Sequence, residues 1–261
     1  MMLALLCAIY AATVSLSVAR SDRLKWVDSA RNAAIAVWPL LTFACFCMTY
    51  LLINERFEIE YVARVSSHAM PWYLKATALW GGQAGSLLFW AWLMSTYTAL
   101  VMLRDWHNER DMQPFVIAST MTTLAFFIGL NVFVENPFTK LWIDRFGQTS
   151  AAFLAPSGAQ PFAPTDGQGL NPLLRHPGMI IHPPMLYLGF VGFVIPYSFA
   201  IAALAVRRSD DIWIRITRRW TLISWLFLSL GLLLGGRWAY DVLGWGGYWG
   251  WDPVEIAAFM P

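Results

Sequence analysis

The chain has 261 residues, of which 58% are hydrophobic and only 13% are charged. Several apolar runs reach the ~20 residues needed to cross the hydrocarbon layer, so the composition excludes a soluble globular protein and predicts a polytopic membrane protein. The formal net charge is +2 and no basic cluster is interleaved with aromatic residues, so nothing indicates binding to nucleic acid.

The predicted fold class is all-α, a polytopic membrane helical bundle in which residues 1–261 form one membrane domain. We expect about six complete transmembrane helices and the start of a seventh. The expected spans are residues 1–19, 33–53, 85–103, 114–134, 179–206 and 221–234. A long outer loop, residues 135–178, is rich in proline, glycine and polar side chains, and its length predicts a segment that is either functional or disordered.

The basic residues predict the orientation of the chain in the membrane. None precedes the first apolar run, whereas several follow it, which is the reverse of a cleavable signal peptide. The proposed inner loops are short and carry more Lys and Arg per residue than the outer segments. The positive-inside rule therefore places the N-terminus, the 135–178 loop and the stretch after the sixth span on the outer side.

The stretch Gly235–Glu255, GGRWAYDVLGWGGYWGWDPVE, combines aromatic rings with glycine. Four glycines are interleaved with the rings of Trp238, Tyr240, Trp245, Tyr248, Trp249 and Trp251. So much glycine is unfavourable in a packed helix, at about 1 kcal/mol each against alanine. The combination favours a flat apolar platform whose backbone a large planar ligand can approach closely. An interfacial aromatic belt is the alternative.

The charged residues of this stretch have more than one interpretation. Arg237 could pair with a ligand carboxylate, or it could snorkel at the end of the sixth helix. Asp252 and Glu255, with a proline between them, have the pattern of a capped helix start, which explains them better than catalysis does. An apolar run over residues 256–260 follows, so we expect a seventh span to begin here and the chain to be a fragment or one piece of a split protein.

His182 is the histidine with the strongest indication of a functional role. It precedes Pro183 and Pro184, so the fifth helix is expected to begin there, with His182 near its N-cap at the outer surface. Two membrane crossings separate it from the tryptophan stretch, so both are expected on the same face. An imidazole beside an aromatic platform is the arrangement of a haem iron ligand, and a histidine that caps its helix is the alternative. We expect the other histidines to be solvated loop residues: His68, His107 and His176.

Three blocks of the chain resemble one family. The residues WGGYWGWDPVE (245–255), LNPLLRHPGMIIHPPMLYLGFVGF (170–193) and PWYLKATALWGGQAGSLLFW (71–90) are similar to those of the cytochrome c biogenesis haem lyases of the CcmF type. These lyases belong to a haem-handling family that is defined by a "WWD" domain. The blocks are spread along the chain, so the resemblance covers nearly all of it.

The resemblance implies that residues 235–255 are the WWD segment and bind haem b, as a substrate, on the periplasmic side of the bacterial inner membrane. His182 matches the first of two outer histidines that ligate the haem iron. A haem chaperone would deliver the haem, which becomes attached through thioethers to the CxxCH cysteines of an apocytochrome c presented by membrane partners. No catalytic residue is assigned. The implied haem-binding residues are His182, Arg237, Trp238, Trp245, Tyr248, Trp249, Trp251 and Asp252.

This chain departs from the family pattern in its histidines. The second outer histidine and both histidines that hold a second, membrane-embedded haem b would lie beyond Pro261, and no other histidine of the chain matches them. The chain alone is therefore expected to hold haem weakly, not to ligate the second haem and not to complete the reaction. A separate C-terminal chain is one expected partner. A smaller departure is Ile256-Ala257-Ala258, where the family usually has Asn-Ala-Ser.

Other functions are compatible with some of these features. A haem transporter or exporter subunit of the same superfamily would share the WWD segment, but it would not be expected to have the 71–90 block or so long an outer loop. A b-type electron-transfer subunit needs mid-membrane histidines, which we do not find in the predicted spans. A solute transporter usually has polar residues within its spans, and Asn131 is the clearest candidate here.

Overall fold

The computed structural model describes residues 1–19, 24–104, 110–208, 210–242 and 247–260. The membrane helices in this part of the chain are α1 (Met2–Val18), α2 (Leu24–Ile53), α5 (Gln83–Arg104), α6 (Gln113–Phe133), α7 (Pro177–Gly192), α8 (Val194–Ala205) and α9 (Ile212–Val242). Shorter elements are α3 (Glu60–Val65), α4 (Trp72–Thr77), η1 (Ala78–Trp80), β1 (Lys140–Ile143), β2 (Thr149–Ala152), β3 (Gln160–Pro161), η2 (Pro172–Leu174) and α10 (Pro253–Phe259).

The predicted helical membrane fold is confirmed. Within the described residues, five helical segments are long and apolar enough to cross a membrane, and α1, with 17 residues, is a shorter apolar helix. One of the five segments, Pro177–Ala205, comprises α7 and α8 together. The fold is not purely helical, because the outer loop contains a small sheet.

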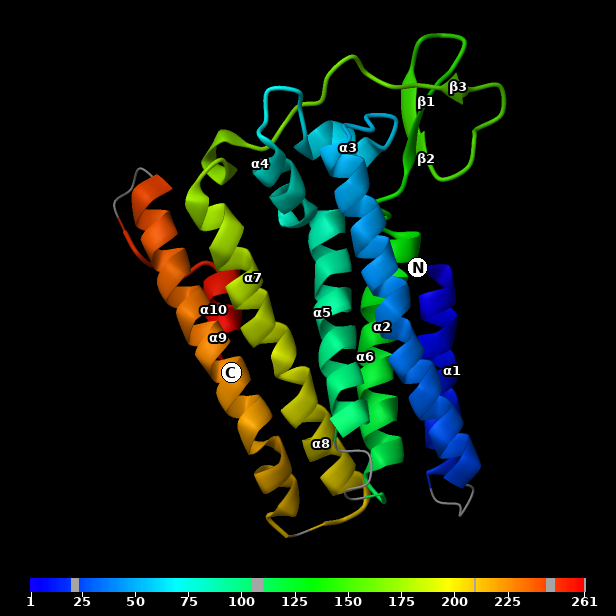
Figure 1. The fold of residues 1–261 in the computed structure, drawn as a ribbon, viewed down its shortest axis with the longest axis vertical. Coiled ribbons are helices and arrows are strands. Elements are labelled where there is room, and N and C mark those ends of the chain that lie inside the picture. Colours follow the sequence, from blue (N-terminus) through cyan, green and yellow to red (C-terminus); the bar gives the residue numbers. More distant parts are fainter. Residues whose placement is uncertain (20–23, 105–109, 209, 243–246, 261) are drawn as a thin grey trace.

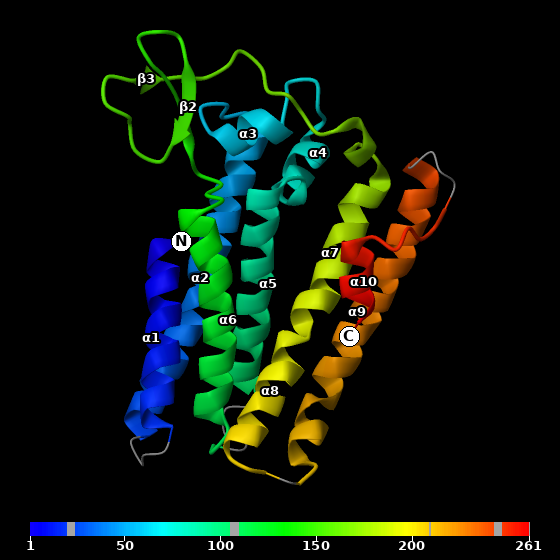
Figure 2. The same ribbon diagram turned by 180° about the vertical axis from the view of Figure 1, so that it is seen from behind.

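The helices form two layers (Figures 1 and 2). In the first, α1, α2, α5 and α6 make a four-helix bundle in which α1 contacts α2 and α6, and α5 does the same. The second layer lies beside it: α7 contacts α5, α8 contacts α6, and α9 lies along the far side of α7 and α8. Both figures show α3, α4 and the strands at one end of the bundle, which we call the sheet end.

Glycines bring α7 and α9 close together. A Cβ atom added at Gly189 of α7 would lie 2.2 Å from the backbone nitrogen of Leu228, and one added at Gly231 of α9 would lie 2.6 Å from the Cα of Leu186. In lipid, burial of apolar side chains does not drive helices together. Small residues such as glycine allow the backbones to approach closely, so that van der Waals packing holds the helices. The close contact fixes α7 against the second half of α9.

Prolines shape the fifth span. Pro196 has no N–H for the carbonyl of Gly192, and the helix is interrupted there, with Phe193 between α7 and α8. Pro183 likewise leaves the carbonyl of Met179 without its helical donor. Trp80 Nε1 donates to that carbonyl at 2.9 Å, so α7 continues through the prolines and is joined to η1.

The outer loop is ordered over its described length. Its three strands pair antiparallel in the order β2-β1-β3, with Leu141 opposite Ala151 and Ile143 opposite Gln160. Residues 165–170 then cross the sheet end. Along this segment Gln168 N donates to the Ala63 carbonyl at 2.7 Å. The disordered alternative for this loop is therefore wrong, because backbone hydrogen bonds and a sheet hold it.

Candidate functional site

The structure places His182 within α7, not at its start. The N-cap is His176, whose Nδ1 accepts a hydrogen bond from Gly178 N at 3.0 Å, and the first helical residue is Pro177. His182 lies in the second turn, roughly 7 Å along the helix axis. The predicted N-cap position of His182 is wrong because the freed carbonyl before Pro183 finds a donor in Trp80. His176 caps the helix, so it is not simply a solvated loop residue.

A backbone carbonyl orients the imidazole of His182. Its Nδ1 lies 2.8 Å from the carbonyl oxygen of Gly231 on α9. Because a carbonyl oxygen only accepts, Nδ1 carries the proton and donates it. In the neutral ring the lone pair is then on Nε2, and no other described residue forms a hydrogen bond with Nε2. This is the tautomer in which a histidine can ligate a metal through Nε2.

Helix α9 continues through the first part of the tryptophan stretch. We expected the sixth span to end at residue 234 and a flat, glycine-rich platform to follow, but α9 extends to Val242. The glycines here make space for neighbours. A Cβ at Gly235 would lie 2.5 Å from His182 Cε1, and one at Gly236 would lie 3.0 Å from the carbonyl oxygen of Tyr248. The next turn carries Trp238, whose ring centroid is 5.6 Å from that of His182.

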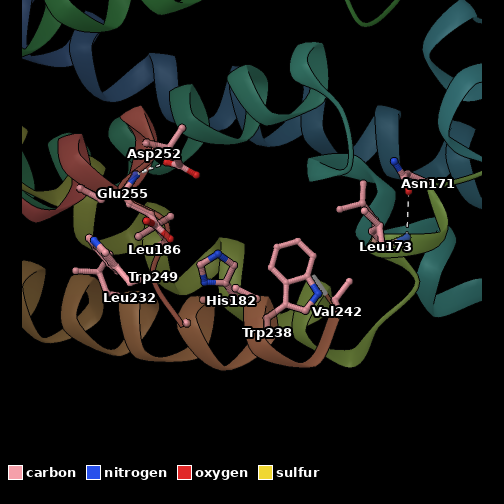
Figure 3. A pocket seen from close by; sticks show the side chains of 16 residues that line it. Asn171, Leu173, His182, Leu186, Leu232, Trp238, Val242, Trp249, Asp252 and Glu255 are labelled. Carbon is pink, nitrogen blue, oxygen red and sulfur yellow. Dashed lines mark hydrogen bonds between the residues drawn. The ribbon is translucent and has the colours of Figure 1, made fainter. Parts of the chain in front are cut away.

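Two cavities adjoin at His182 and Trp238. The first has a volume of about 320 Å³ and is lined from α7, α9, α10, η2 and the segment between α9 and α10. Figure 3 shows His182 between Trp238 on one side and Trp249 and Leu186 on the other. The second, of about 570 Å³, shares His182 and Trp238 and extends towards α5 and η1. Val254 and Ala258 line both cavities, so α10 contributes to the wall of each.

Three tryptophans that line the cavities carry indole N–H donors for which the described residues provide no acceptor. Trp238 and Trp249 are among the residues that line the first cavity, and Trp90 and Trp238 are among those that line the second. All three nitrogens are buried and have no hydrogen-bond partner among the described residues. A buried donor without a partner costs about 1–3 kcal/mol, so these groups favour a ligand that carries acceptors.

The structure separates the predicted site residues into those that line a cavity and those that do not. Asp252 lines the first cavity and is the N-cap of α10, accepting from Glu255 N at 2.7 Å, which confirms the predicted capping. Arg237, Tyr248 and Trp251 line neither cavity. Trp245 lies outside the described residues, as does His107.

The three residues away from the cavities have partners of their own. Arg237 Nε lies 3.0 Å from Asp241 Oδ2, one helical turn further along α9. Tyr248 stacks on Tyr240, with ring centroids 4.5 Å apart and planes inclined by 7°. Trp251 is 67% exposed and touches Trp249 edge-on.

Leu173 and Leu174, which the sequence did not single out, line the first cavity. They belong to η2, and Asn171 caps this turn by accepting from Leu173 N at 3.0 Å. The Asn-Pro pair at residues 171–172 is a turn signal that could have indicated an ordered element. Gly231 was not singled out, and Gly235 was named only as the first residue of the tryptophan stretch, although their four-residue spacing is the pattern of close helix packing.

His68 links the first outer loop to the segment 165–170. Its Nδ1 contacts the Glu55 carboxylate and its Nε2 lies 3.1 Å from the Thr165 carbonyl oxygen, so a doubly protonated ring satisfies both acceptors. The hydrogen bond to Glu55 raises the pKa of His68. The pKa of Glu55 is lowered, chiefly by its hydrogen bond with Lys75. His68 is exposed, as expected for a loop residue, but it is held at both ring nitrogens.

Comparison with known proteins identifies the family. The family model described as "Cytochrome C assembly protein" matches residues 80–261. The chain belongs to this family. Residues 80–261 include all of α7, α9 and α10 and therefore every helix that lines the first cavity.

The relatives narrow the family to the CcmF type. The chain is 42% identical to the cytochrome c-type biogenesis protein CcmF of Pseudomonas aeruginosa over 93% of its own length and 34% of the relative. It is 38% identical to CcmF of Escherichia coli, over 94% of this chain and 35% of that protein. A solved structure, "Cytochrome c Heme Lyase CcmF", superposes with a TM-score of 0.80 at 31% identity, covering 99% of this chain and 38% of the other.

These matches confirm the resemblance inferred from the sequence and support it over the exporter alternative. The chain corresponds to the N-terminal part of CcmF-type cytochrome c biogenesis proteins, a bacterial family of multi-pass membrane proteins. It spans about a third of the length of the curated relatives it matches.

Proposed function

We propose that the first cavity is part of a haem seat, in which haem b is held as a substrate with its iron on His182 Nε2. The observation that carries this proposal is the imidazole itself. Gly231 fixes its Nδ1, its Nε2 has no described partner, and it borders a cavity walled by Trp238 and Trp249. A backbone carbonyl on the second ring nitrogen is the usual support of a metal-ligating histidine.

The residues present fit such a ligand. Haem is a planar apolar macrocycle with two carboxylates, and the cavities are lined mainly by apolar and aromatic side chains, as small-molecule sites usually are. Both volumes fall within the roughly 300–1,000 Å³ of such sites. The unpaired indole N–H groups of Trp238 and Trp249 are donors that a ligand carboxylate could use.

In this proposal the protein orients the haem and sets its surroundings. His182 would ligate the iron, and the rings of Trp238 and Trp249 would pack against the macrocycle. Asp252 would fix the start of α10 beside it. Trp245 and the exposed residues Arg237, Tyr248 and Trp251 remain proposed members of the haem-binding segment. The bound group supplies vinyl groups to which two cysteine thiols add.

The wider setting is also a proposal, and it follows from the family. We infer that the sheet end and the N-terminus lie on the periplasmic side of the bacterial inner membrane. A haem chaperone would deliver haem there, and membrane partners would present the CxxCH segment of apocytochrome c. The lyase reaction belongs to the complete assembly. There, a segment equivalent to the remaining part of the longer relatives, or a separate C-terminal chain, would supply the second iron ligand and hold the membrane-embedded haem b.

The test is a haem titration of the purified chain in detergent, followed by visible absorbance. We expect His182→Ala to bind haem at least about tenfold more weakly and to lose the spectrum of a histidine-ligated iron. His182→Gly should regain that spectrum when free imidazole is added, which separates a lost ligand from a misfolded protein. His68→Gln, at an exposed histidine that lines neither cavity, is the matched control. Wild-type affinity and spectrum in His182→Ala would refute the proposal.

A further inference from the structure

Gly235 faces the imidazole of His182 across the contact between α7 and α9. A Cβ atom at this position would lie 2.5 Å from Cε1, 3.0 Å from Nδ1 and 3.2 Å from Nε2 of the ring. The first distance is shorter than any van der Waals contact. The residue lies inside regular helix, and it is not among the described glycines with positive φ. Gly235 is therefore needed for the space it leaves and not for an unusual backbone conformation.

One turn earlier on the same helix, Gly231 provides the carbonyl that accepts from His182 Nδ1. The ring is thus fixed from two sides by α9: a hydrogen bond at Nδ1, and the backbone of Gly235 against the Cε1 edge. A rotation that broke the hydrogen bond would also move the Cε1 edge of the ring relative to the backbone of Gly235. With both in place, Nε2 is the only ring nitrogen left for a ligand.

We propose that Gly235 is a positioning residue that, together with the Gly231 carbonyl, holds the His182 ring in the orientation that presents Nε2 to a ligand. The orientation of the ring is argued only from the hydrogen bond to Gly231 and the contact with Gly235. Its consequence for haem rests on the proposed function. The α7–α9 glycine contact is then part of the binding site as well as of the helix packing.

Gly235 is the glycine at which this role can be tested without forcing the helices apart. At Gly189 and Gly231 an added Cβ would strike the backbone of the opposite helix, which cannot move aside. At Gly235 the nearest atoms belong to a side chain that can rotate. Gly235→Ala is therefore expected to fold and to turn the ring. Gly129→Ala is the matched control, because that membrane-helix glycine has nothing within 4 Å of the added atom.

The first measurement needs no haem. The chain has four histidines, so nitrogen-15 spectra of histidine-labelled protein resolve the protonation of each ring, and the His182 signals are assigned by their loss in His182→Gln. We expect Gly235→Ala to shift these signals away from the Nδ1-protonated, hydrogen-bonded form, and Gly129→Ala to leave them unchanged. Unchanged His182 signals in Gly235→Ala would overturn the inference.

The second measurement is a stability cycle that keeps the inference falsifiable if Gly235→Ala is poorly folded. If the added methyl group clashes with the imidazole, His182→Ala removes the clash, so the thermal midpoint lost in Gly235→Ala should be recovered in the double variant. An equal loss in both backgrounds would show that the methyl group meets something other than His182, and would overturn the inference.

Haem titration then separates this inference from the proposed function. Loss of an orienting partner typically weakens a metal site about 10–100-fold, and we expect a decrease of that size for Gly235→Ala. If the ring signals shift but haem affinity stays at the wild-type value, the positioning role is supported and His182 is not the iron ligand. The proposed function alone would then fail.

Discussion

At the scale of single residues, the site is defined by hydrogen bonds that are made and by others that are not. His182 has one ring nitrogen fixed and one without a described partner, and the buried indole N–H groups of Trp238 and Trp249 have none either. In the four-helix bundle Trp92 does find an acceptor, at Thr42 Oγ1, 2.9 Å away. The buried indole donors without a described partner, those of Trp90, Trp238 and Trp249, thus all belong to residues that line the two cavities.

The unused donors predict the behaviour of Trp238→Phe and Trp249→Phe. Each removes a donor that has no described partner, so the gain offsets the lost ring contacts and the free energy of unfolding should change by less than about 1 kcal/mol. Haem affinity should fall, because the indole N–H is no longer available to a carboxylate. Thermal unfolding and haem titration measure the two effects.

Trp92→Phe is the control, since it breaks an existing hydrogen bond away from both cavities. It should cost about 1 kcal/mol of stability and leave haem affinity unchanged. If the two cavity variants lost as much stability as this control and kept full affinity, their N–H groups would have no role in binding.

Several residue roles could be predicted from the sequence and others could not. The capping pattern at Asp252 is local, and it was predicted correctly. The helix start before His182 was misjudged because the donor that satisfies Met179 comes from Trp80, about a hundred residues away in the chain. Trp251 belongs to the aromatic stretch of the sequence but is exposed in the fold, and the local sequence gives no signal for that exposure.

At the scale of elements, the segment 165–170 joins two parts of the sheet end. Gly169 N donates to the Ser66 carbonyl at 3.0 Å, and Asp166 Oδ1 accepts from the backbone N–H of His68 at 2.9 Å, which lowers the pKa of Asp166. The segment then leads into η2, which lines the first cavity. Its anchoring therefore bears on the cavity wall.

This anchoring should depend on pH. The pKa of His68 is raised by its hydrogen bond to Glu55. The protonated His68 therefore stabilises the anchoring fully below the usual histidine pKa of 6.5, and this stabilisation is lost as pH rises through the raised pKa. The pKa of Glu55 is lowered, so its contribution is complete above the usual 4.5 and is lost as pH falls through the lowered value. The segment should be held best between about pH 4.5 and pH 6.5.

Hydrogen exchange of the Gln168 and Gly169 amides, corrected for the intrinsic rate, measures this effect. Protection should be greatest inside the window, and His68→Gln should remove the decrease on the alkaline side. Protection that does not vary with pH in the wild-type chain would mean that the backbone bonds alone hold the segment.

At the scale of the whole molecule, hydropathy is enough to predict the helical membrane fold, because length and apolar content are local properties of each span. The division into two layers is not predictable in this way, since it depends on which helix faces meet. The same holds for the sheet, whose strands are short and only partly buried. The shared face of His182 and Trp238 could be predicted from the even number of crossings, but their contact at 5.6 Å could not.

The turn at Gly158 is a position where we expect the backbone to tolerate proteolytic cleavage without loss of the fold. This glycine lies in the exposed connection between β2 and β3, with φ of +76° and nothing within 4 Å of an added Cβ. Contacts of α5 with α7, of α6 with α8, and of the segment 165–170 with α3 cross this position in the chain. We expect a chain with a protease site inserted after Gly158 to stay together when cleaved, and its two pieces to co-purify in detergent. Pieces that separate would contradict this.

The same contacts imply that the two parts of the chain could also be synthesised as separate polypeptides and still assemble. Two genes, one encoding residues 1–158 and one encoding residues 159–261, should yield partners that assemble in the membrane by complementation. His182, Trp238 and Trp249 would all be encoded by the second gene, while the first would supply Trp80 and Trp90 of the neighbouring cavity.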